Sequence, residues 1–332
     1  MSRLISAIIT LVGVALLVVL VQRVGVAAVA AGVRQVSWGF LLILAISGLR
    51  ILVRAAAWRL CLDADDARAV SVRQAFAAGL AAEAIGSLTP LGLLASEPAK
   101  AAWVRNAVPF GRAMAAVAIE NVLYSISVAI VIAAGTIALL ISFNLPEGLR
   151  QASELSLALM GGALVVLVAA FWLAGRRLSL FGAMAERLLG GRGIAVGARI
   201  RRFETRAHDA VRLAHGRLVP ISLLETLFHA GGVAEAYVTV WMLTGEPPTV
   251  LAAFVLETAN RIVNVVFRFV PLRVGVDEAG SAIIARVLGL GTTVGVTLAV
   301  VRKARVLCWS ALGIVLMLRR GLTPRKLVDE TV

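Results

Sequence analysis

Cysteine and histidine are scarce in this chain of 332 residues. It contains two cysteines, Cys61 and Cys308, and three histidines, His208, His215 and His229. Two isolated cysteines form neither a disulfide framework nor a zinc site, and the histidines lack the spacing of metal ligands. We therefore expect no metal site and no other cofactor.

Charge is also scarce. Only 16% of the residues are Asp, Glu, Lys or Arg, whereas 60% are hydrophobic and the mean hydropathy is +0.93. A soluble domain is about 45–50% apolar, and a soluble protein of this length could not bury the excess apolar surface. The composition therefore excludes a water-soluble enzyme and a disordered chain. It predicts an all-α, polytopic integral membrane protein.

Basic residues outnumber acidic ones and give a net charge of +14, which on its own would suit a nucleic-acid partner. The distribution of the charge favours a different explanation. Residues 176–217 contain ten arginines and three acidic residues, hence a net charge of +7, between two hydrophobic stretches. Such loops stay on the cytoplasmic side of a membrane. We therefore expect a basic cytoplasmic connector, no nucleic-acid partner, and an inner (cytoplasmic) membrane protein with both termini in the cytoplasm.

Long apolar runs predict about six full transmembrane helices within a single membrane domain, residues 1–332. These helices are expected at 4–22, 36–60, 121–146, 155–175, 218–243 and 295–318. The first run resembles a signal peptide, but 19 residues are too many for the apolar core of one. We therefore expect a retained helix, which forms with the second run a peripheral pair at 1–60.

Two further apolar stretches, 74–112 and 250–290, are interrupted by proline, glycine and charge. The interruptions are Thr89-Pro90-Leu91-Gly92 and the segment from Phe269 to Gly275. The charges of the flanking loops place both ends of the first stretch inside and both ends of the second outside. Each stretch therefore either crosses the membrane twice or forms a re-entrant pair of short helices. The shortness of the second arms favours re-entrant pairs.

A shared motif in the two broken stretches indicates an internal repeat. Residues 90–97 read PLGLLASE and residues 271–278 read PLRVGVDE, so both have Pro-Leu, five residues and then Glu. With the long helices that follow, they define repeat 1 at 74–146 and repeat 2 at 250–318. Because the first stretch enters from the inside and the second from the outside, we expect inverted topology. This arrangement is typical of secondary transporters whose binding site lies near the midplane.

The two breaks predict a cavity, because non-helical backbone at membrane depth is tolerated only inside protein or beside a wet cavity. Ionisable side chains around it must pair, face water or bind a ligand. Basic residues that we expect to bind an anionic head group are Arg50, Arg261, Arg268, Arg273, Arg302 and Arg305. Residues that we expect to form the breaks or to couple movement to protons are Pro90, Gly92, Glu97, Glu120, Glu257, Pro271, Gly275, Asp277 and Glu278.

Some of these side chains have an alternative, structural interpretation. Glu97 and Glu278 could cap the N-termini of the second arms, where the helix dipole favours an acidic group. Arg302 and Arg305 could form structural ion pairs with Glu257 or Glu278. These alternatives stay open at the level of the sequence.

Three other charged residues are expected to have structural roles, and Glu120 has a structural alternative as well. Arg54 is expected to extend to the cytoplasmic edge of its helix, as long basic side chains do near membrane surfaces. Glu225 and Glu235 are expected to pair with neighbouring arginines. Glu120 is either a functional acid or a charge at the rim of its helix.

The segment that begins Thr89-Pro90 and ends Ser96-Glu97-Pro98-Ala99-Lys100 resembles the P…GE…R motif of the lysylphosphatidylglycerol synthase transmembrane-region family, also called flippase-like membrane proteins. Residues 269–280 resemble that family's second motif, PGGxGxxE. Ser96 replaces a glycine of the first motif, and Leu272 and Arg273 replace the Gly-Gly of the second. These departures resemble the branch associated with hopanoid biosynthesis. The resemblance extends over nearly the whole chain.

The resemblance and the repeat together imply a flippase that moves an anionic or polyisoprenoid lipid, a hopanoid-related one included, by alternating access. Its partners would be membrane lipids and an enzyme of lipid biosynthesis. Two alternatives are an accessory membrane scaffold in lipid or hopanoid biosynthesis and an integral-membrane lipid-linked transferase. We expect no enzymatic activity, because the synthase chemistry of the family belongs to a separate soluble domain for which we expect no room in this chain.

Overall fold

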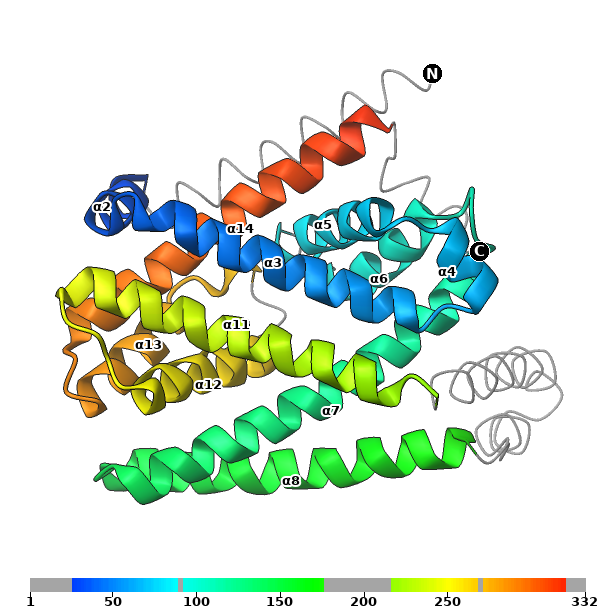
Figure 1. Cartoon of the computed structure of the whole chain (residues 1–332). Coiled ribbons are helices and arrows are strands. Elements are labelled where there is room, and N and C mark those ends of the chain that lie inside the picture. The colour runs from blue at the N-terminus through cyan, green and yellow to red at the C-terminus, as the bar shows by residue number, and fades with distance from the viewer. Residues whose placement is uncertain (1–25, 89–91, 176–215, 268–270, 321–332) are drawn as a thin grey trace, which may run out of the picture.

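The computed structural model describes residues 26–88, 92–175, 216–267 and 271–320, and the regular elements within these ranges are helices (Figure 1). They are α2 (Val26–Val36), α3 (Gly39–Leu60), α4 (Ala64–Ala69), α5 (Val72–Leu88), α6 (Gly92–Trp103), α7 (Phe110–Ser142), α8 (Glu147–Gly175), α11 (Leu218–Thr244), α12 (Val250–Val266), the short 3-10 helix η2 (Pro271–Arg273), α13 (Val276–Val287) and α14 (Thr292–Arg319). The prediction of an all-α fold is confirmed for this part of the chain. The helix expected at 4–22, most of the basic connector, Pro90 and Arg268 lie outside the described residues.

Three of the described helices are long and apolar enough to cross a membrane. They are Gly39–Leu60, Phe110–Ser142 and the segment Glu147–Ala169 of α8. The helices α11 and α14 have 27 and 28 residues, so at about 1.5 Å per residue each exceeds the roughly 30 Å of a bilayer core. Their charged residues lower their mean hydropathy, and these residues form the site described below.

Two of the predicted spans begin earlier in the structure than hydropathy indicates. The run at 121–146 is part of α7, which starts at Phe110, and the run at 155–175 is part of α8, which starts at Glu147. Glu120 is therefore the eleventh residue of α7, and its side chain has no exposed surface. The alternative that Glu120 is a rim charge is wrong, because ten residues of helix precede it and its side chain is fully buried.

Helices of similar order and length lie in the two segments that we predict to be repeats. In the first, α5 of 17 residues is followed by a break, α6 of 12 residues and the long helix α7. In the second, α12 of 17 residues is followed by η2, α13 of 12 residues and the long helix α14. Figure 1 shows α5 and α6 toward one end of the long helices and α12 and α13 toward the other. Whether these pairs re-enter or cross the membrane stays a prediction.

The long helix of each repeat packs closely against the first short helix of the other. A Cβ atom on Gly135 of α7 would collide with Thr258 of α12, and one on Gly313 of α14 would collide with the main-chain oxygen of Leu80 in α5. Thr258 and Leu80 are each the ninth residue of their helix. The two halves of the chain are therefore interlocked through a pair of corresponding close approaches.

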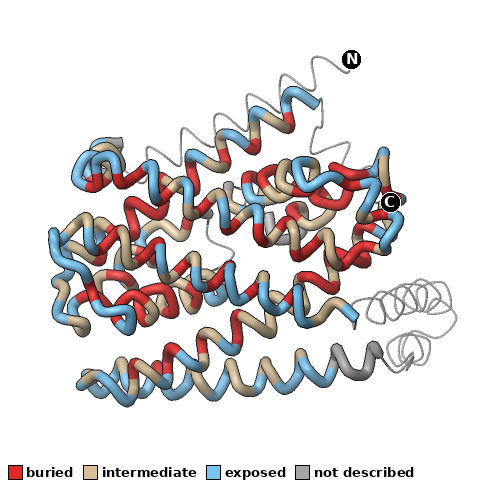
Figure 2. The backbone as a smooth tube through the Cα atoms, in the orientation of Figure 1, coloured by how far each residue is buried: buried red, intermediate tan, exposed pale blue. Residues whose placement is uncertain are grey.

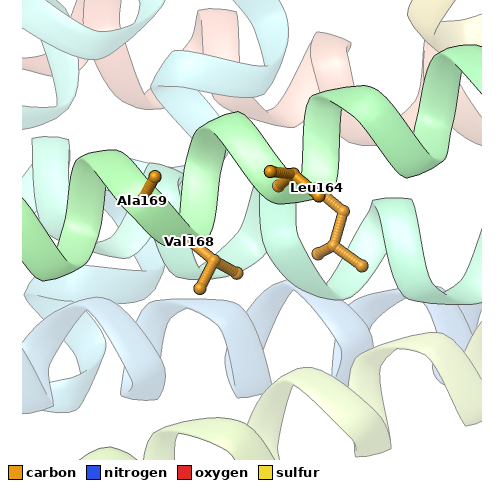
Figure 3. Close-up of a pocket in the computed structure, with 4 residues that line it drawn as sticks. Leu164, Val168 and Ala169 are labelled. Carbon is orange, nitrogen blue, oxygen red and sulfur yellow. The ribbon is translucent and has the colours of Figure 1, made fainter.

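The helix α8 lies at the edge of the molecule and packs on α7 (Figure 1). Only 6% of its apolar window is buried by the rest of the structure, and Figure 2 shows exposed and intermediate residues along most of its length. A shallow open hollow on α8 is lined by Leu164, Val165, Val168 and Ala169, all apolar (Figure 3). Such a surface is suited to contact with lipid tails.

Two apolar clusters make up much of the core. One is built from α3, α5, α6 and α7 around Trp58, Val108 and Ile119. The other is built from α11, α12, α13 and α14, around Leu256 and Leu298. The helices α3, α11, α12 and α14 that contribute to these clusters also carry the buried charges described below.

Candidate functional site

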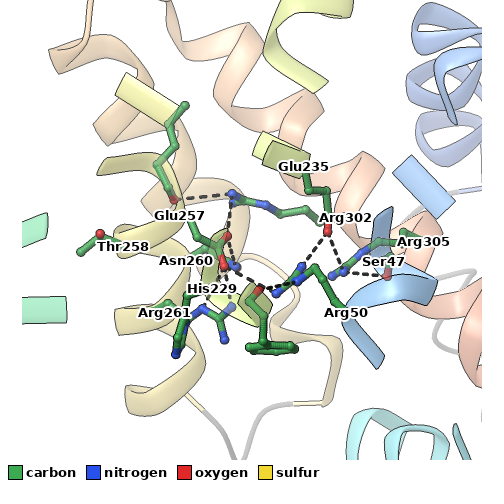
Figure 4. A network of polar contacts seen from close by, with 12 residues as sticks. Ser47, Arg50, His229, Glu235, Glu257, Thr258, Asn260, Arg261, Arg302 and Arg305 are labelled. Carbon is green, nitrogen blue, oxygen red and sulfur yellow. Dashed lines mark hydrogen bonds and ion pairs between the residues drawn. The ribbon is translucent and has the colours of Figure 1, made fainter. Parts of the chain in front are cut away.

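Four helices bring together a group of buried charges that we call the arginine cluster (Figure 4). Its members are Arg50 of α3, Glu235 of α11, Glu257 and Arg261 of α12, and Arg302 and Arg305 of α14. All are buried except Arg305, whose side chain is 16% exposed. Four arginines face two glutamates, so the cluster has an excess of two positive charges.

The two glutamates act as acceptors for several arginines each. Glu235 Oε2 lies 2.6 Å from Arg50 Nη1 and 3.0 Å from Arg305 Nη1. Glu257 Oε1 lies 2.8 Å from Arg261 Nη2 and 3.7 Å from Arg50 Nη2, and Glu257 Oε2 lies 3.6 Å from Arg302 Nη2. Arg50 thus contacts both glutamates and connects α3 to α11 and α12.

A pair of glycines on α11 makes room for these side chains. A Cβ atom on Gly232 would lie 2.5 Å from Glu257 Oε1, and one on Gly231 would lie 2.7 Å from Arg50 Cγ. Any larger residue would push the glutamate or the arginine away from the α11 backbone. The Gly-Gly sequence in the middle of α11 therefore has a packing role at the cluster.

Some guanidinium groups of the cluster have N–H donors without an acceptor among the described residues. Arg302 Nη1 and Arg305 Nε are buried and have no hydrogen-bond partner among the described residues. The other contacts of Arg302 are long, 3.5 Å to the Leu256 carbonyl and 3.6 Å to Glu257. Buried donors without acceptors are costly, so the arrangement is suited to an additional anion.

The second break supplies another arginine beside the cluster. Leu272 and Arg273 have positive φ angles of 50° and 48°, a conformation that non-glycine residues adopt rarely. Leu272 is buried against Val306 and Leu307 of α14, which holds the strained turn in place. Arg273 Nε is buried without a partner among the described residues, and the group interacts electrostatically with Arg302 and Arg305. Strain of this kind is concentrated at functional sites.

The acidic residues after the second break have structural contacts. Glu278 Oε2 accepts a hydrogen bond of 2.8 Å from the backbone nitrogen of Gly275, which precedes α13 and has a φ of 87°. Lys303 Nζ lies 2.9 Å from Glu278 and 3.4 Å from Asp277. The predicted capping role of Glu278 is therefore present, and an ion pair that the sequence did not indicate accompanies it.

Glu97 differs from Glu278, although the two align in the repeat. The helix α6 begins at Gly92, so Glu97 is its sixth residue and lies beyond the first turn. The expectation that Glu97 caps this helix is wrong, because a capping side chain must reach the free N–H groups of the first turn. Glu97 Oε2 is buried and has no hydrogen-bond partner among the described residues.

A second group of charges lies near the first and is centred on Glu120. Arg54 Nε is 2.8 Å from Glu120 Oε1, and Lys100 Nζ is 2.9 Å from Glu120 Oε2. The expectation that Arg54 extends to the cytoplasmic edge is wrong, since its side chain turns inward to this buried acid. We call Arg54, Lys100 and Glu120 the Glu120 cluster.

Tyr124 connects the two clusters. The guanidinium carbon of Arg54 lies 3.9 Å from the centre of the Tyr124 ring, and Arg261 Nη1 donates a hydrogen bond of 3.0 Å to its hydroxyl group. Tyr124 also stacks on His229, whose Nε2 is 2.9 Å from Ser127 Oγ. A change in one cluster can therefore reach the other through a single side chain.

The structure brings together most of the predicted head-group residues. Arg50, Arg261, Arg302 and Arg305 lie in the arginine cluster, and Arg273 adjoins it. Glu235 pairs with two of these arginines, as the sequence predicted, whereas Glu225 is buried with neither carboxylate oxygen hydrogen-bonded among the described residues. The prediction that Glu225 pairs with an arginine is therefore not met.

Lys100, Lys303 and Tyr124 are site residues that the sequence analysis did not select. Both lysines lie in segments predicted to enter the membrane, and a charge there is a signal for a buried partner. Tyr124 carries no such signal, because an isolated tyrosine in a transmembrane helix is ordinary. Within the described ranges, no group of three or more His, Cys, Asp or Glu is arranged to hold a metal ion.

Neither the comparison with curated proteins nor the comparison with solved structures gives a significant match. The comparison with family models gives a match. The description of the matching model agrees with the three long apolar helices of the structure and with a membrane location. This model, the lysylphosphatidylglycerol synthase TM region, matches residues 4–313, and the chain therefore belongs to that family.

Proposed function

We propose that this protein is a flippase that binds the anionic head group of a lipid in the arginine cluster and moves it across the cytoplasmic membrane. One observation carries the proposal: the cluster is buried among helices of a membrane protein, yet it has two more positive charges than negative ones and guanidinium donors without acceptors among the described residues. Uncompensated charge inside a membrane is expensive and marks a functional site.

A phosphate group fits this environment better than other common anions of a membrane. Arginine presents planar pairs of N–H donors that match two oxygens of a phosphate. Free donors belong to Arg302, Arg305 and Arg273, and Arg273 interacts electrostatically with the other two arginines as well as with Asp277 and Glu83. A singly charged phosphodiester would lower the excess charge from two to one, and a phosphomonoester with two charges would neutralise it.

Movement of the head group would follow from the repeat. The helix pairs α5–α6 and α12–α13 lie toward opposite ends of the long helices (Figure 1), so each pair can open a path from one side, as in alternating access. The lipid tails would stay outside, against apolar surfaces such as that of α8. We further propose that both termini are cytoplasmic and that the lipid is anionic or polyisoprenoid, with hopanoid-related lipids among the candidates.

This proposal assigns the protein no chemical step, and an enzyme of lipid biosynthesis is its expected partner. The competing functions are an accessory scaffold and a lipid-linked transferase, and membership of this family is compatible with both. A scaffold needs no buried anion site, and a transferase needs reactive groups beside one. The arginine cluster favours transport over both.

The test is lipid movement in reconstituted vesicles. Purified protein is placed in liposomes that contain a fluorescent phosphatidylglycerol, and dithionite quenching reports transfer between leaflets. Arg302→Gln is the informative variant, because Arg302 makes only long contacts, and Arg150→Gln is the control, because Arg150 is exposed and pairs only with Glu154. Loss of a charged hydrogen bond of about 1.5–3 kcal/mol predicts transfer about 10- to 100-fold slower in Arg302→Gln. Transfer at the same rate in both variants, or none in the wild type with any anionic lipid, would refute the proposal.

A further inference from the structure

Glu225 is a buried acid of α11 that forms no ion pair with the described residues. It lies in the third turn of the helix, is 2% exposed, and neither of its carboxylate oxygens has a hydrogen-bond partner in the part of the chain that the structure describes. Burial without a partner favours the neutral form of a carboxyl group over the charged one. The environment is therefore that of a group that holds a proton.

The cations near Glu225 are engaged with other acids. Glu225 interacts electrostatically with Arg54, Lys100 and Arg261. However, Arg54 and Lys100 occupy the two oxygens of Glu120, and Arg261 lies 2.8 Å from Glu257. Each positive charge that could hold Glu225 ionised thus has a closer acid as its partner.

The remaining titratable neighbours do not supply a positive charge either. Glu120 of α7 is an acid and opposes a second negative charge nearby. Cys61, at the end of α3, is buried and interacts with both Glu120 and Glu225. His229 lies four residues after Glu225 on the same face of α11, and its Nδ1 atom is buried without a partner among the described residues.

From these contacts we propose that Glu225 is a proton-binding site that couples proton movement to lipid movement. The proposal rests on the function proposed above. A proton on Glu225 removes a negative charge near Arg54 of the Glu120 cluster and near Arg261 of the arginine cluster. Tyr124 contacts both of these arginines and so links the two clusters. Less negative charge near these arginines favours an anion in the arginine cluster, so proton and lipid bind together. The cargo is then one proton with one singly charged lipid, which is electrically neutral, and both move in the same direction.

The first test detects the proton directly and does not depend on transport. Infrared spectra of the purified protein in lipid should contain the C=O stretching band of a protonated carboxyl group, and this band should shift when the wild type is transferred to heavy water. We expect Glu225→Gln to lose the band and Glu154→Gln, which changes an exposed acid, to keep it. A band of unchanged intensity in Glu225→Gln would overturn the proton site. Because glutamine has the shape of glutamic acid, the fold is expected to persist.

The second test measures coupling. Vesicles with a pH step of one unit and an anionic fluorescent lipid are brought to a steady state with the membrane potential collapsed. One proton per lipid predicts about tenfold enrichment of the lipid in the leaflet that faces the alkaline side. Glu225→Gln should distribute the lipid equally between leaflets, and Glu154→Gln should behave as the wild type. Enrichment on the acidic side, or undiminished enrichment in Glu225→Gln, would overturn coupling at Glu225.

The two tests separate this proposal from the proposed function. If no variant and no wild-type protein moves any lipid, the flippase proposal and the coupling fail together. The infrared band then still decides whether Glu225 holds a proton. If lipid moves but ignores the pH step, the flippase stands and the coupling is refuted.

Discussion

Arg50 of α3 and Glu235 of α11 form an ion pair of 2.6 Å between residues that lie 185 positions apart in the sequence. The same arginine reaches toward Glu257 of α12, and the same glutamate binds Arg305 of α14. This pair thus joins the helix before the first repeat to the helices of the second. The arginine cluster is therefore both a candidate ligand site and a structural junction.

Removal of Glu235 should destabilise the protein. In Glu235→Gln, Arg50 and Arg305 lose their shared carboxylate, and breaking a buried pair from one side costs about 3–5 kcal/mol. Unfolding of the purified protein by heat or denaturant in detergent measures the loss. Glu154→Gln, at an exposed pair on α8, should change stability by less than about 1 kcal/mol. Equal effects of the two variants would contradict the structural role of the cluster.

Gly232→Ala should disturb the cluster without any change of charge. The new methyl group would lie 2.5 Å from Glu257 Oε1 and displace it, at a cost of about 1–3 kcal/mol. Gly161→Ala is the matched control, because Gly161 lies in a helix with nothing within 4 Å of the added atom. Alanine favours a helix over glycine by about 0.5–1 kcal/mol, so the control should be neutral or stabilised. If both alanines raise the stability, Gly232 has no packing role.

Alanine at either close approach between the repeats should lower the stability, but a second substitution should restore it at only one of them. In Gly135→Ala the obstructing atoms belong to the Thr258 side chain, so adding Thr258→Gly should restore part of the lost stability. In Gly313→Ala the obstructing atom is the main-chain oxygen of Leu80, so Leu80→Gly should restore none. Thermal unfolding of the four variants provides the measurement. Rescue of Gly313→Ala by Leu80→Gly would contradict the packing of α14 on α5.

Glu278 should contribute to the stability of the protein in two separable ways, as a helix cap and as the ion-pair partner of Lys303. Glu278→Gln keeps an oxygen that can accept from the Gly275 nitrogen, but it removes the charge that faces Lys303. Glu278→Ala removes both contacts and should be less stable than the glutamine variant by about 1 kcal/mol, the usual value of a helix cap. Denaturant unfolding compares the two directly. A glutamine variant no more stable than the alanine variant would show that the cap contributes nothing.

Much of the architecture could be predicted from the sequence, because apolar runs and proline-glycine breaks report local physical constraints. The helices α5 and α12 end at Leu88 and Val266, next to the breaks that the motifs indicate, and α6 and α13 each have 12 residues. The starts of α7 and α8 were missed, since charged and polar first turns lower the hydropathy at helix ends. Helix ends are set by caps and tertiary packing, which the sequence expresses weakly.

The partners of the buried charges could be predicted less well. Arg54 was expected at the edge of its helix and Glu120 was left open between a functional acid and a rim charge, yet they pair with each other because α3 and α7 meet inside the bundle. Glu225 and Glu235 are ten residues apart on one helix and were treated alike, but of the two only Glu235 forms ion pairs with arginines of the described residues. Which acid meets which base depends on how distant helices pack, and a single sequence does not contain that information in readable form.

The most direct test of the central claim is equilibrium binding of an anionic head group to the arginine cluster. Titration of the purified wild type and Arg302→Gln with a short-chain phosphatidylglycerol, and with the zwitterionic phosphatidylcholine as the reference, measures the affinities. Our account predicts tighter binding of phosphatidylglycerol by the wild type and about 10- to 100-fold weaker binding by Arg302→Gln, with Arg150→Gln unchanged. Equal affinities of the wild type and Arg302→Gln for phosphatidylglycerol would contradict it.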